Sequence, residues 1–150
     1  MAQIDYLRII YNYLFFDKSA LASQYKSSID NLVLNFSYTK ILFRHLGLSI
    51  SHIYQSTPRP SLVRIPQHIT GGKLFYSGNL FNNNLNLQLG IQAHVFQSFK
   101  GYAYMPSTQV FYLQDIYSTA ALPFVDFYLN ARVRPVNIFI KVENLLNNYT

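Results

Sequence analysis

Charged residues recur with a period of two near the end of the chain, on two consecutive segments at 124–134 and 136–146. Residues two apart on a β-strand lie on the same side of a sheet, so these charges would share one face. They could line a polar space whose local field biases the passage of solutes. They could also form a ladder of cross-strand ion pairs, each worth about 0.2–1 kcal/mol, and we favour this second interpretation. The residues are Asp126, Arg132, Arg134, Lys141 and Glu143.

The histidines and carboxylates do not indicate a metal or catalytic site. No two histidines stand four residues apart, and alternation places His52 with apolar residues but His94 with polar ones, so we expect no converging metal ligands. The carboxylates are dispersed, although spacing alone leaves a glycosidase-type pair open. The sequence lacks a phosphate-cradling glycine loop, a nucleophile elbow and cysteine. We therefore expect a protein that is not an enzyme and that holds no cofactor or metal.

The composition is unusual for a soluble domain. Half of the 150 residues are hydrophobic and only 12% are charged, whereas about 25% is the usual charged share. The apolar stretches fall well short of the roughly 20 residues that a membrane-spanning helix needs. Backbone in a bilayer must satisfy its own hydrogen bonds, so a closed barrel of strands is the remaining way to place this much apolar surface in lipid. The composition thus predicts an all-β, antiparallel up-and-down transmembrane barrel in a bacterial outer membrane.

The net charge of +6 raises the question of nucleic acid as a partner. Lysine and arginine are scattered, however, and never form a basic run. We expect no nucleic acid, but outer-membrane lipid and small solutes, with a homo-oligomer or envelope-complex partners left open. The first residues lack the basic and apolar regions of a secretory leader. We therefore expect either that a leader has been removed or that the chain begins inside a longer protein.

Alternation of apolar and polar residues is clearest over 85–95, and its length matches a tilted membrane-spanning strand of about 9–11 residues. Similar patterns predict seven spanning strands, at 4–16, 30–43, 46–55, 72–81, 84–99, 124–134 and 136–146. The candidate lipid-facing residues are Leu85, Leu87, Leu89, Ile91, Val95, Phe127 and Leu129. The candidate pore-lining residues on the opposite parity are Lys73, Asp126, Arg132, Arg134, Lys141 and Glu143.

The first two predicted strands have their own apolar sets. Between 30 and 43 the set is Leu32, Leu34, Phe36 and Tyr38, with polar residues between them. Between 4 and 16 we assign the apolar parity to Leu7, Ile9, Tyr11, Tyr13 and Phe15, although the alternate set is mixed and also contains apolar residues.

The predicted connections alternate between long and short. Long links at about 18–29, 56–71 and 100–123 alternate with tight turns near 44–45, 82–84 and 135. Bacterial outer-membrane barrels show this order, with short periplasmic turns and long extracellular loops. The third long link could hold a small hairpin near 110–117 that stands above the membrane. We see no domain boundary, so residues 1–150 are expected to form one barrel domain.

The last third of the chain, about 97–144, resembles a family of outer-membrane proteins described as putative porins. The matching residues are Tyr102-Ala103-Tyr104-Met105-Pro106 with Phe111-Tyr112, Leu122-Pro123-Phe124-Val125-Asp126, Ala131-Arg132-Val133-Arg134 and Ile138-Phe139-Ile140-Lys141-Val142-Glu143. Val63-Arg64-Ile65-Pro66 also has a counterpart there. The resemblance implies a passage for small solutes across the outer membrane. Glu143-Asn144-Leu145-Leu146-Asn147-Asn148-Tyr149 is in turn similar to a segment near the end of TonB-dependent transporters.

Seven is an odd number of strands, whereas bacterial single-chain barrels have an even number. An unpaired seventh strand would leave backbone groups unsatisfied in lipid. We therefore expect the chain to be a portion of a larger barrel that further strands close. The alternatives to a porin-like passage are the barrel of a TonB-dependent transporter, an accessory barrel of an envelope complex, and a soluble β-barrel or sandwich binding module.

Overall fold

The structure is a computed structural model that describes residues 2–9 and 13–146, and within 2–9 the backbone only. The described residues are all-β and antiparallel. They contain no helix long and apolar enough to cross a membrane. The strands are β1 Ala2–Ile9, β2 Tyr13–Phe16, β3 Ala22–Tyr25, β4 Ile29–Ile41, β5 Leu46–Ser56, β6 His68–Leu80, β7 Leu85–Phe96, β8 Tyr102–Met105, β9 Val110–Leu113, β10 Pro123–Val133 and β11 Val136–Val142.

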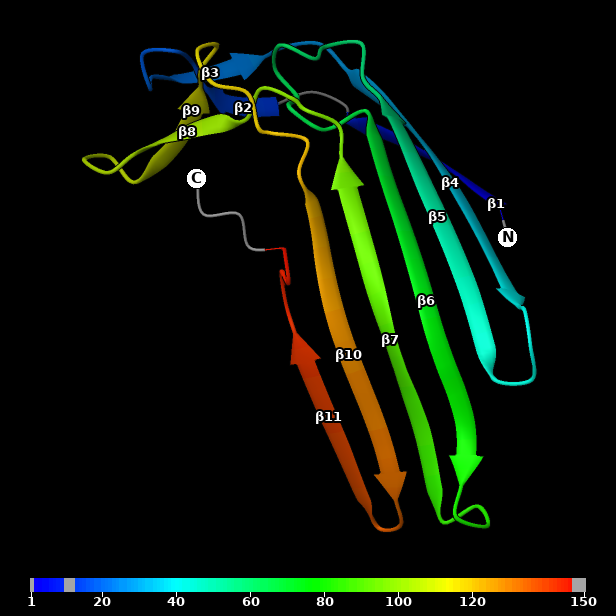
Figure 1. Cartoon of the computed structure of the whole chain (residues 1–150). Coiled ribbons are helices and arrows are strands. Elements are labelled where there is room, and N and C mark those ends of the chain that lie inside the picture. The colour runs from blue at the N-terminus through cyan, green and yellow to red at the C-terminus, as the bar shows by residue number, and fades with distance from the viewer. Residues whose placement is uncertain (1, 10–12, 147–150) are drawn as a thin grey trace.

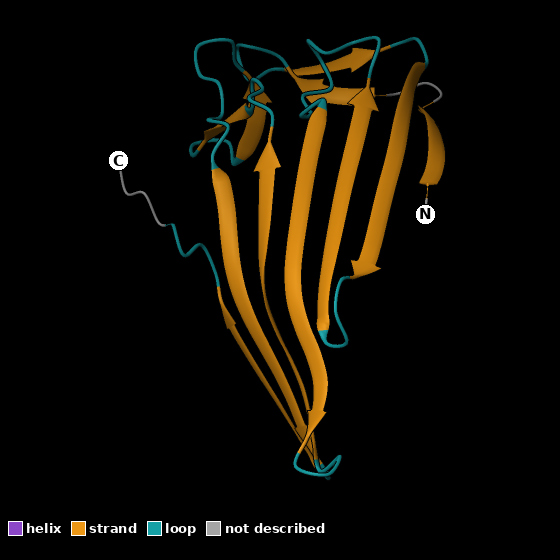
Figure 2. Ribbon diagram, turned by 45° about the vertical axis from the view of Figure 1, so that its right-hand side comes forward, coloured by secondary structure: helices purple, strands orange, loops and turns teal. Residues whose placement is uncertain are grey.

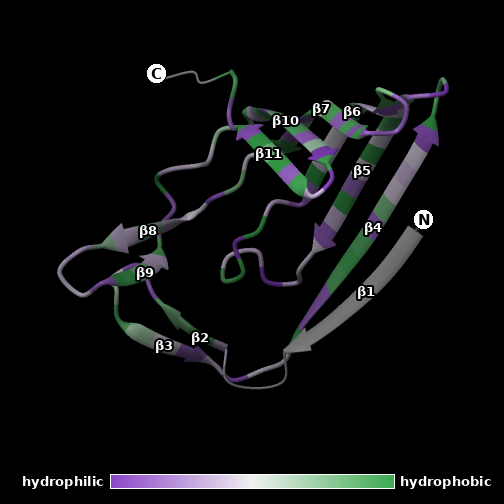
Figure 3. Ribbon diagram, turned by 90° about the horizontal axis from the view of Figure 1, so that it is seen from below, coloured by the Kyte–Doolittle hydropathy of each residue, from purple (hydrophilic) through white to green (hydrophobic). Residues whose placement is uncertain are grey.

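Seven of these strands form one sheet in the order β1-β4-β5-β6-β7-β10-β11 (Figure 1). Each strand pairs antiparallel with the next strand of the sheet, which is the up-and-down topology that the sequence predicts. The sheet curves in cross-section when seen from below (Figure 3). It does not close: β1 and β11 are the edge strands of the described sheet. A closed barrel therefore remains a prediction.

The strand register gathers the alternating residues into two faces. Leu89 lies between Tyr76 on β6 and Leu129 on β10, and Ile91 lies between Leu74 and Phe127. We call this side the apolar face. Polar residues from the same strands line up on the opposite side, the polar face, where Gln92 lies between Lys73 and Asp126. The predicted period of two is confirmed on these strands, because the register preserves it across the sheet.

The prediction of a single spanning strand at 4–16 is wrong. β1 pairs with β4 only from Ala2 to Ile9, because β4 begins at Ile29 and offers no partner beyond that point. Tyr13 to Phe16 instead form β2, which pairs with β3 in a separate two-stranded sheet. Residues 10–12, including the predicted apolar Tyr11, lie outside the described residues.

The apolar parity predicted for the first strand is also wrong. The register pairs Ile4 with Leu34 and Tyr6 with Leu32, whereas Leu7 pairs with Asn31. The positions of Leu7 and Ile9 therefore belong to the polar face. Alternation could not decide this parity, because apolar residues occupy both sets in that segment.

All long connections lie at one end of the main sheet and all short turns at the other (Figure 2). The long-connection end holds the links β1 to β4, β5 to β6 and β7 to β10. Two of these links contain small hairpins, β2–β3 and β8–β9. The second lies in the third long link, as predicted, but it spans 102–113 and not 110–117. The short-turn end includes the turn at 81–84, where Asn82 and Asn83 adopt positive φ angles of 54° and 68°, a conformation that asparagine tolerates well.

Few side chains are fully buried, because the main sheet is a single layer. Among the described residues, the buried apolar side chains are Ile29, Leu113 and Tyr128. Many large apolar side chains are instead exposed on the apolar face, including Phe36, Leu74, Ile91 and Ile140. A soluble domain would cover such a surface with a second layer.

Candidate functional site

The centre of the predicted pore-lining group is Asp126 on β10. Its carboxylate accepts hydrogen bonds from the side-chain amide of Gln92 at 3.1 Å and from the backbone N–H of Asn144 at 3.0 Å. The Lys141 ammonium on β11 lies 3.2 Å from Asp126 and 2.7 Å from Glu143. These contacts connect β7, β10 and the segment after β11 across the polar face. Among the described residues this group has one cross-strand ion pair, Asp126 with Lys141, which is what the structural interpretation expects of each rung but is not a ladder.

Arg132 and Arg134 lie apart from these ion pairs. Arg132 is opposite Asn86 on β7 and Asn137 on β11, and Arg134 follows the end of β10. Within the part of the chain that the structure describes, neither arginine forms an ion pair. Both line an open pocket of about 340 Å³ at the short-turn end, together with Asn79, Asn83, Asn84 and Asn86. Their charges are therefore not neutralised by a carboxylate of the described residues.

Lys73, the remaining predicted lining residue, packs on aromatic rings. Its ammonium lies 4.5 Å from the centre of the Tyr128 ring and 5.4 Å from that of Phe75, a cation–π arrangement. The hydroxyl of Tyr128 lies against Gly90, where an added methyl would stand 2.5 Å from the carbonyl oxygen of Leu74. Gly90 therefore permits the close packing that buries Tyr128 on the polar face.

The predicted lipid-facing residues all lie on the apolar face of β7 and β10. Ile91 is 50% and Val95 is 40% exposed. The other members, Leu85, Leu87, Leu89, Phe127 and Leu129, are half-buried by their neighbours in the sheet. The register brings this group together, and the assignment to lipid stays a prediction.

Two histidines lie close together although their spacing in the sequence did not indicate a contact. His68 Nδ1 lies 3.3 Å from His52 Nε2, and His52 Nδ1 lies 2.9 Å from the hydroxyl of Thr70. Both histidines occupy apolar-face positions, as predicted for His52. The described residues contain no group of three or more histidine, cysteine or carboxylate side chains that could hold a metal ion.

The long-connection end has a charge cluster that the sequence analysis missed. Asp115, after β9, binds Lys18 from the first long link, Arg64 from the second and Lys100 from its own link. We call these four residues the Asp115 cluster. Its ion pairs hold the pKa of Asp115 well below its usual range, chiefly through hydrogen bonds from Lys18 and Arg64. One carboxylate thereby ties all three long links together.

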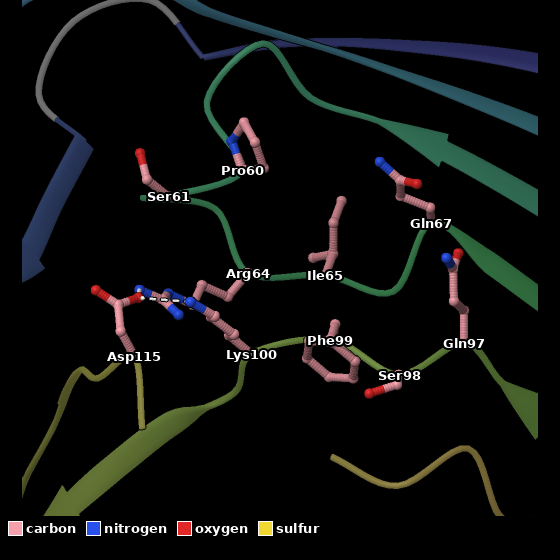
Figure 4. A pocket seen from close by; sticks show the side chains of 10 residues that line it. All are labelled: Pro60, Ser61, Arg64, Ile65, Gln67, Gln97, Ser98, Phe99, Lys100 and Asp115. Atoms are coloured by element: carbon pink, nitrogen blue, oxygen red, sulfur yellow. Dashed lines mark hydrogen bonds and ion pairs between the residues drawn. The ribbon is translucent and has the colours of Figure 1, made fainter. Parts of the chain in front are cut away.

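Arg64 is the buried member of this cluster, with 3% of its side chain exposed. Its guanidinium donates to the Gln114 carbonyl at 2.7 Å and to the Asp115 carboxylate at 2.8 Å. Its Nε is buried and has no hydrogen-bond partner among the described residues. Arg64, Lys100 and Asp115 also line a pocket of about 380 Å³ (Figure 4).

Tyrosine hydroxyls connect the same links. Tyr102 on β8 donates a hydrogen bond to the Leu62 carbonyl at 2.8 Å, and the Tyr13 hydroxyl lies 3.2 Å from that of Tyr102. Burial is the main reason that the pKa of Tyr13 rises to about 12, followed by its hydrogen bond to Tyr102. Only the alternation of link lengths indicated this end of the molecule, because contacts between different links show no periodicity in the sequence.

The β5 to β6 link folds inward. Seen from below, it lies inside the outline formed by the curved sheet and the two hairpins (Figure 3). The side-chain amide of Gln55 donates to the carbonyl of Pro66 in this link at 3.2 Å. Gln55 belongs to the polar face, since it pairs with Val33, whose neighbours Leu32 and Leu34 are on the apolar face. This contact indicates that the polar face is turned toward the enclosed side.

These features define a class of protein: a curved, antiparallel up-and-down sheet with an exposed apolar face and a polar face crossed by hydrogen bonds and ion pairs. The family model described as "Putative porin" matches residues 2–150. The chain belongs to this family, and the match extends the resemblance from 63–66 and 97–144 to nearly all of the sequence. Comparisons with curated proteins and with solved structures gave no significant match.

Proposed function

We propose that the protein is a porin-like β-barrel of the bacterial outer membrane and that it forms a passage for small solutes, without catalysis. The observation that carries this proposal is the two-faced sheet. Its apolar face exposes large side chains that lipid would cover, while its polar face keeps ions and amides in hydrogen-bonded rows. Strands that alternate between lipid-facing and lumen-facing residues are the defining pattern of membrane barrels. Membership of the "Putative porin" family supports the same function.

The passage would run along the polar face, from the Asp115 cluster to the pocket that contains Arg132 and Arg134. Closure of the wall is part of the proposal, because unpaired strand edges are costly in lipid. Strands beyond the described sheet would have to provide it.

Neighbouring residues on β10 offer a direct test, since the chain has no cysteine of its own. Leu129 is on the apolar face, and Asn130 is on the polar face opposite Gln88. We expect Asn130→Cys, in the full protein reconstituted in planar bilayers, to react with a water-soluble thiol reagent and to lose conductance on modification. Leu129→Cys should resist the reagent. Equal reaction of the two variants, or the absence of conductance in the wild-type protein, would contradict the proposed passage.

A further inference from the structure

We propose that the pocket beside the Asp115 cluster binds small organic carboxylates, so that the protein gathers such solutes at the long-connection end. This inference rests on the proposed function, which it deepens by naming a solute class. The pocket, of about 380 Å³, lies between the inward β5 to β6 link and the segment after β7 (Figure 4).

The first argument is the charge that surrounds the pocket. The ion pairs of the cluster join three cations, Lys18, Arg64 and Lys100, to the one carboxylate of Asp115. Two of these cations, Arg64 and Lys100, line the pocket together with Asp115 itself, which leaves one positive charge in excess on the lining. Because Asp115 cannot neutralise all three, the local field favours an anion.

The second argument is a buried donor without a partner. Arg64 uses its two terminal nitrogens for Gln114 and Asp115, but its buried Nε has no partner among the described residues. Buried polar groups are rarely left unsatisfied, and such a group calls for an explanation. Arg64 and Lys100 both line the pocket, so a carboxylate there would be a suitable acceptor for the terminal N–H groups of the guanidinium and for the ammonium.

The third argument concerns the rest of the lining, which suits an organic anion better than a bare ion. Ile65 and Phe99 supply apolar surface, and the side chains of Gln67 and Gln97 supply amide groups (Figure 4). Ligand pockets commonly combine an apolar lining with a few polar groups that fix orientation. A small carboxylate with an aliphatic or aromatic body meets each of these surfaces.

Two lysines provide matched variants for the test. Lys100 and Lys18 both contact Asp115, and their side chains are 52% and 69% exposed, but only Lys100 lines the pocket. Binding of benzoate and of its neutral analogue benzamide would be measured by calorimetry on the full protein in detergent micelles. We expect benzoate to bind and benzamide to bind much more weakly. Lys100→Gln should weaken benzoate binding about tenfold, the factor that corresponds to about 1.4 kcal/mol, while Lys18→Gln, which removes a charge outside the pocket lining, should weaken it less.

Three results would overturn the inference: no benzoate binding to the wild-type protein, equal binding of benzamide, or equal weakening by the two lysine variants. The last would mean that general surface charge, and not the pocket, holds the anion. Because binding is measured without a membrane, the two proposals can fail separately. A protein that conducts but does not bind benzoate loses only this inference, and one that binds benzoate but does not conduct loses only the proposed passage.

Discussion

At the long-connection end three cations converge on Asp115, whereas at the short-turn end Arg132 and Arg134 lie among asparagines with no ion pair in the described residues. The two ends also differ in burial, since Arg64 is enclosed while both short-turn arginines are exposed. The ion pairs of Asp115 and the hydrogen bonds of Tyr102 join the long links to one another. The short turns are held by the strands that they join, so Arg132 and Arg134 are not needed to hold them, and we propose that these charges act on solutes.

We expect the largest effect, a loss of assembly, from a substitution in the main sheet between these two ends. Leu89→Arg places a charge on the apolar face near the middle of β7, and a midplane arginine facing lipid costs about 2–4 kcal/mol. We expect the variant to fail assembly in an outer-membrane folding assay. Gln88 precedes Leu89 and lies on the polar face beside Asn130, so Gln88→Arg should assemble. Equal tolerance of the two substitutions would remove the distinction between the faces.

The substitution Arg64→Met tests whether the charges at the long-connection end hold the long links together. This change removes two hydrogen bonds from a buried guanidinium, and bonds of charged groups contribute about 1.5–3 kcal/mol each. We expect the free energy of unfolding in urea to fall by about 1–3 kcal/mol, because Lys18 and Lys100 still neutralise Asp115. Lys18→Met should cost at most about 1 kcal/mol, as for an exposed ion pair. A greater loss for Lys18→Met would mean that burial does not distinguish these cations.

The solute-directed role at the short-turn end is tested through ion preference. The row around Asp126 is balanced, with Lys73 and Lys141 against Asp126 and Glu143. Arg132 and Arg134, which form no ion pair among the described residues, should therefore give a mild anion preference. Neutralising both arginines to glutamine should bring the reversal potential under a salt gradient toward zero. Glu143→Gln should shift it the opposite way. An unchanged reversal potential in the arginine variant would show that these charges do not face the passage.

How much of the fold the sequence could predict differs in the same way between regular strands and other segments. Where one face is apolar and the other polar, as over 85–95, the period of two fixed the strand, the register parity and the set of residues on each face. It failed between 4 and 16, where both parities contain apolar residues and the segment divides between β1 and β2.

Neither the Asp115 cluster nor the His52 and His68 pair could be found by periodicity. The Arg64 and Asp115 contact spans 51 positions between irregular segments, so only the packing of the long links brings these residues together. The sequence pattern also could not show that Arg132 and Arg134 lie apart from the other predicted pore-lining charges. Asp126 and Arg132 share a parity, but only cross-strand register decides which of them lies within reach of Lys141.

The smallest expected effect concerns the tyrosine pair that joins the first and third links. Tyr102 already donates to the Leu62 carbonyl, so Tyr13 must be the donor in the bond between the two hydroxyls. Ionisation of Tyr13 would remove that donor proton and place a charge in a partly buried site, which is why its pKa is raised to about 12. A tyrosine in the unfolded chain titrates near about 10.

The sign of the pH dependence follows. Because the folded pKa is the higher one, the stabilisation from Tyr13 is fully present below about pH 10 and is lost as the pH rises toward about 12. Tyr13→Phe should lower the free energy of unfolding by less than about 1 kcal/mol at pH 8, since the pair is partly exposed to solvent. The difference between wild type and variant should then shrink between about pH 10 and 12 in urea titrations. A difference that stays constant across this range would show that Tyr13 does not hold its proton through the contact with Tyr102.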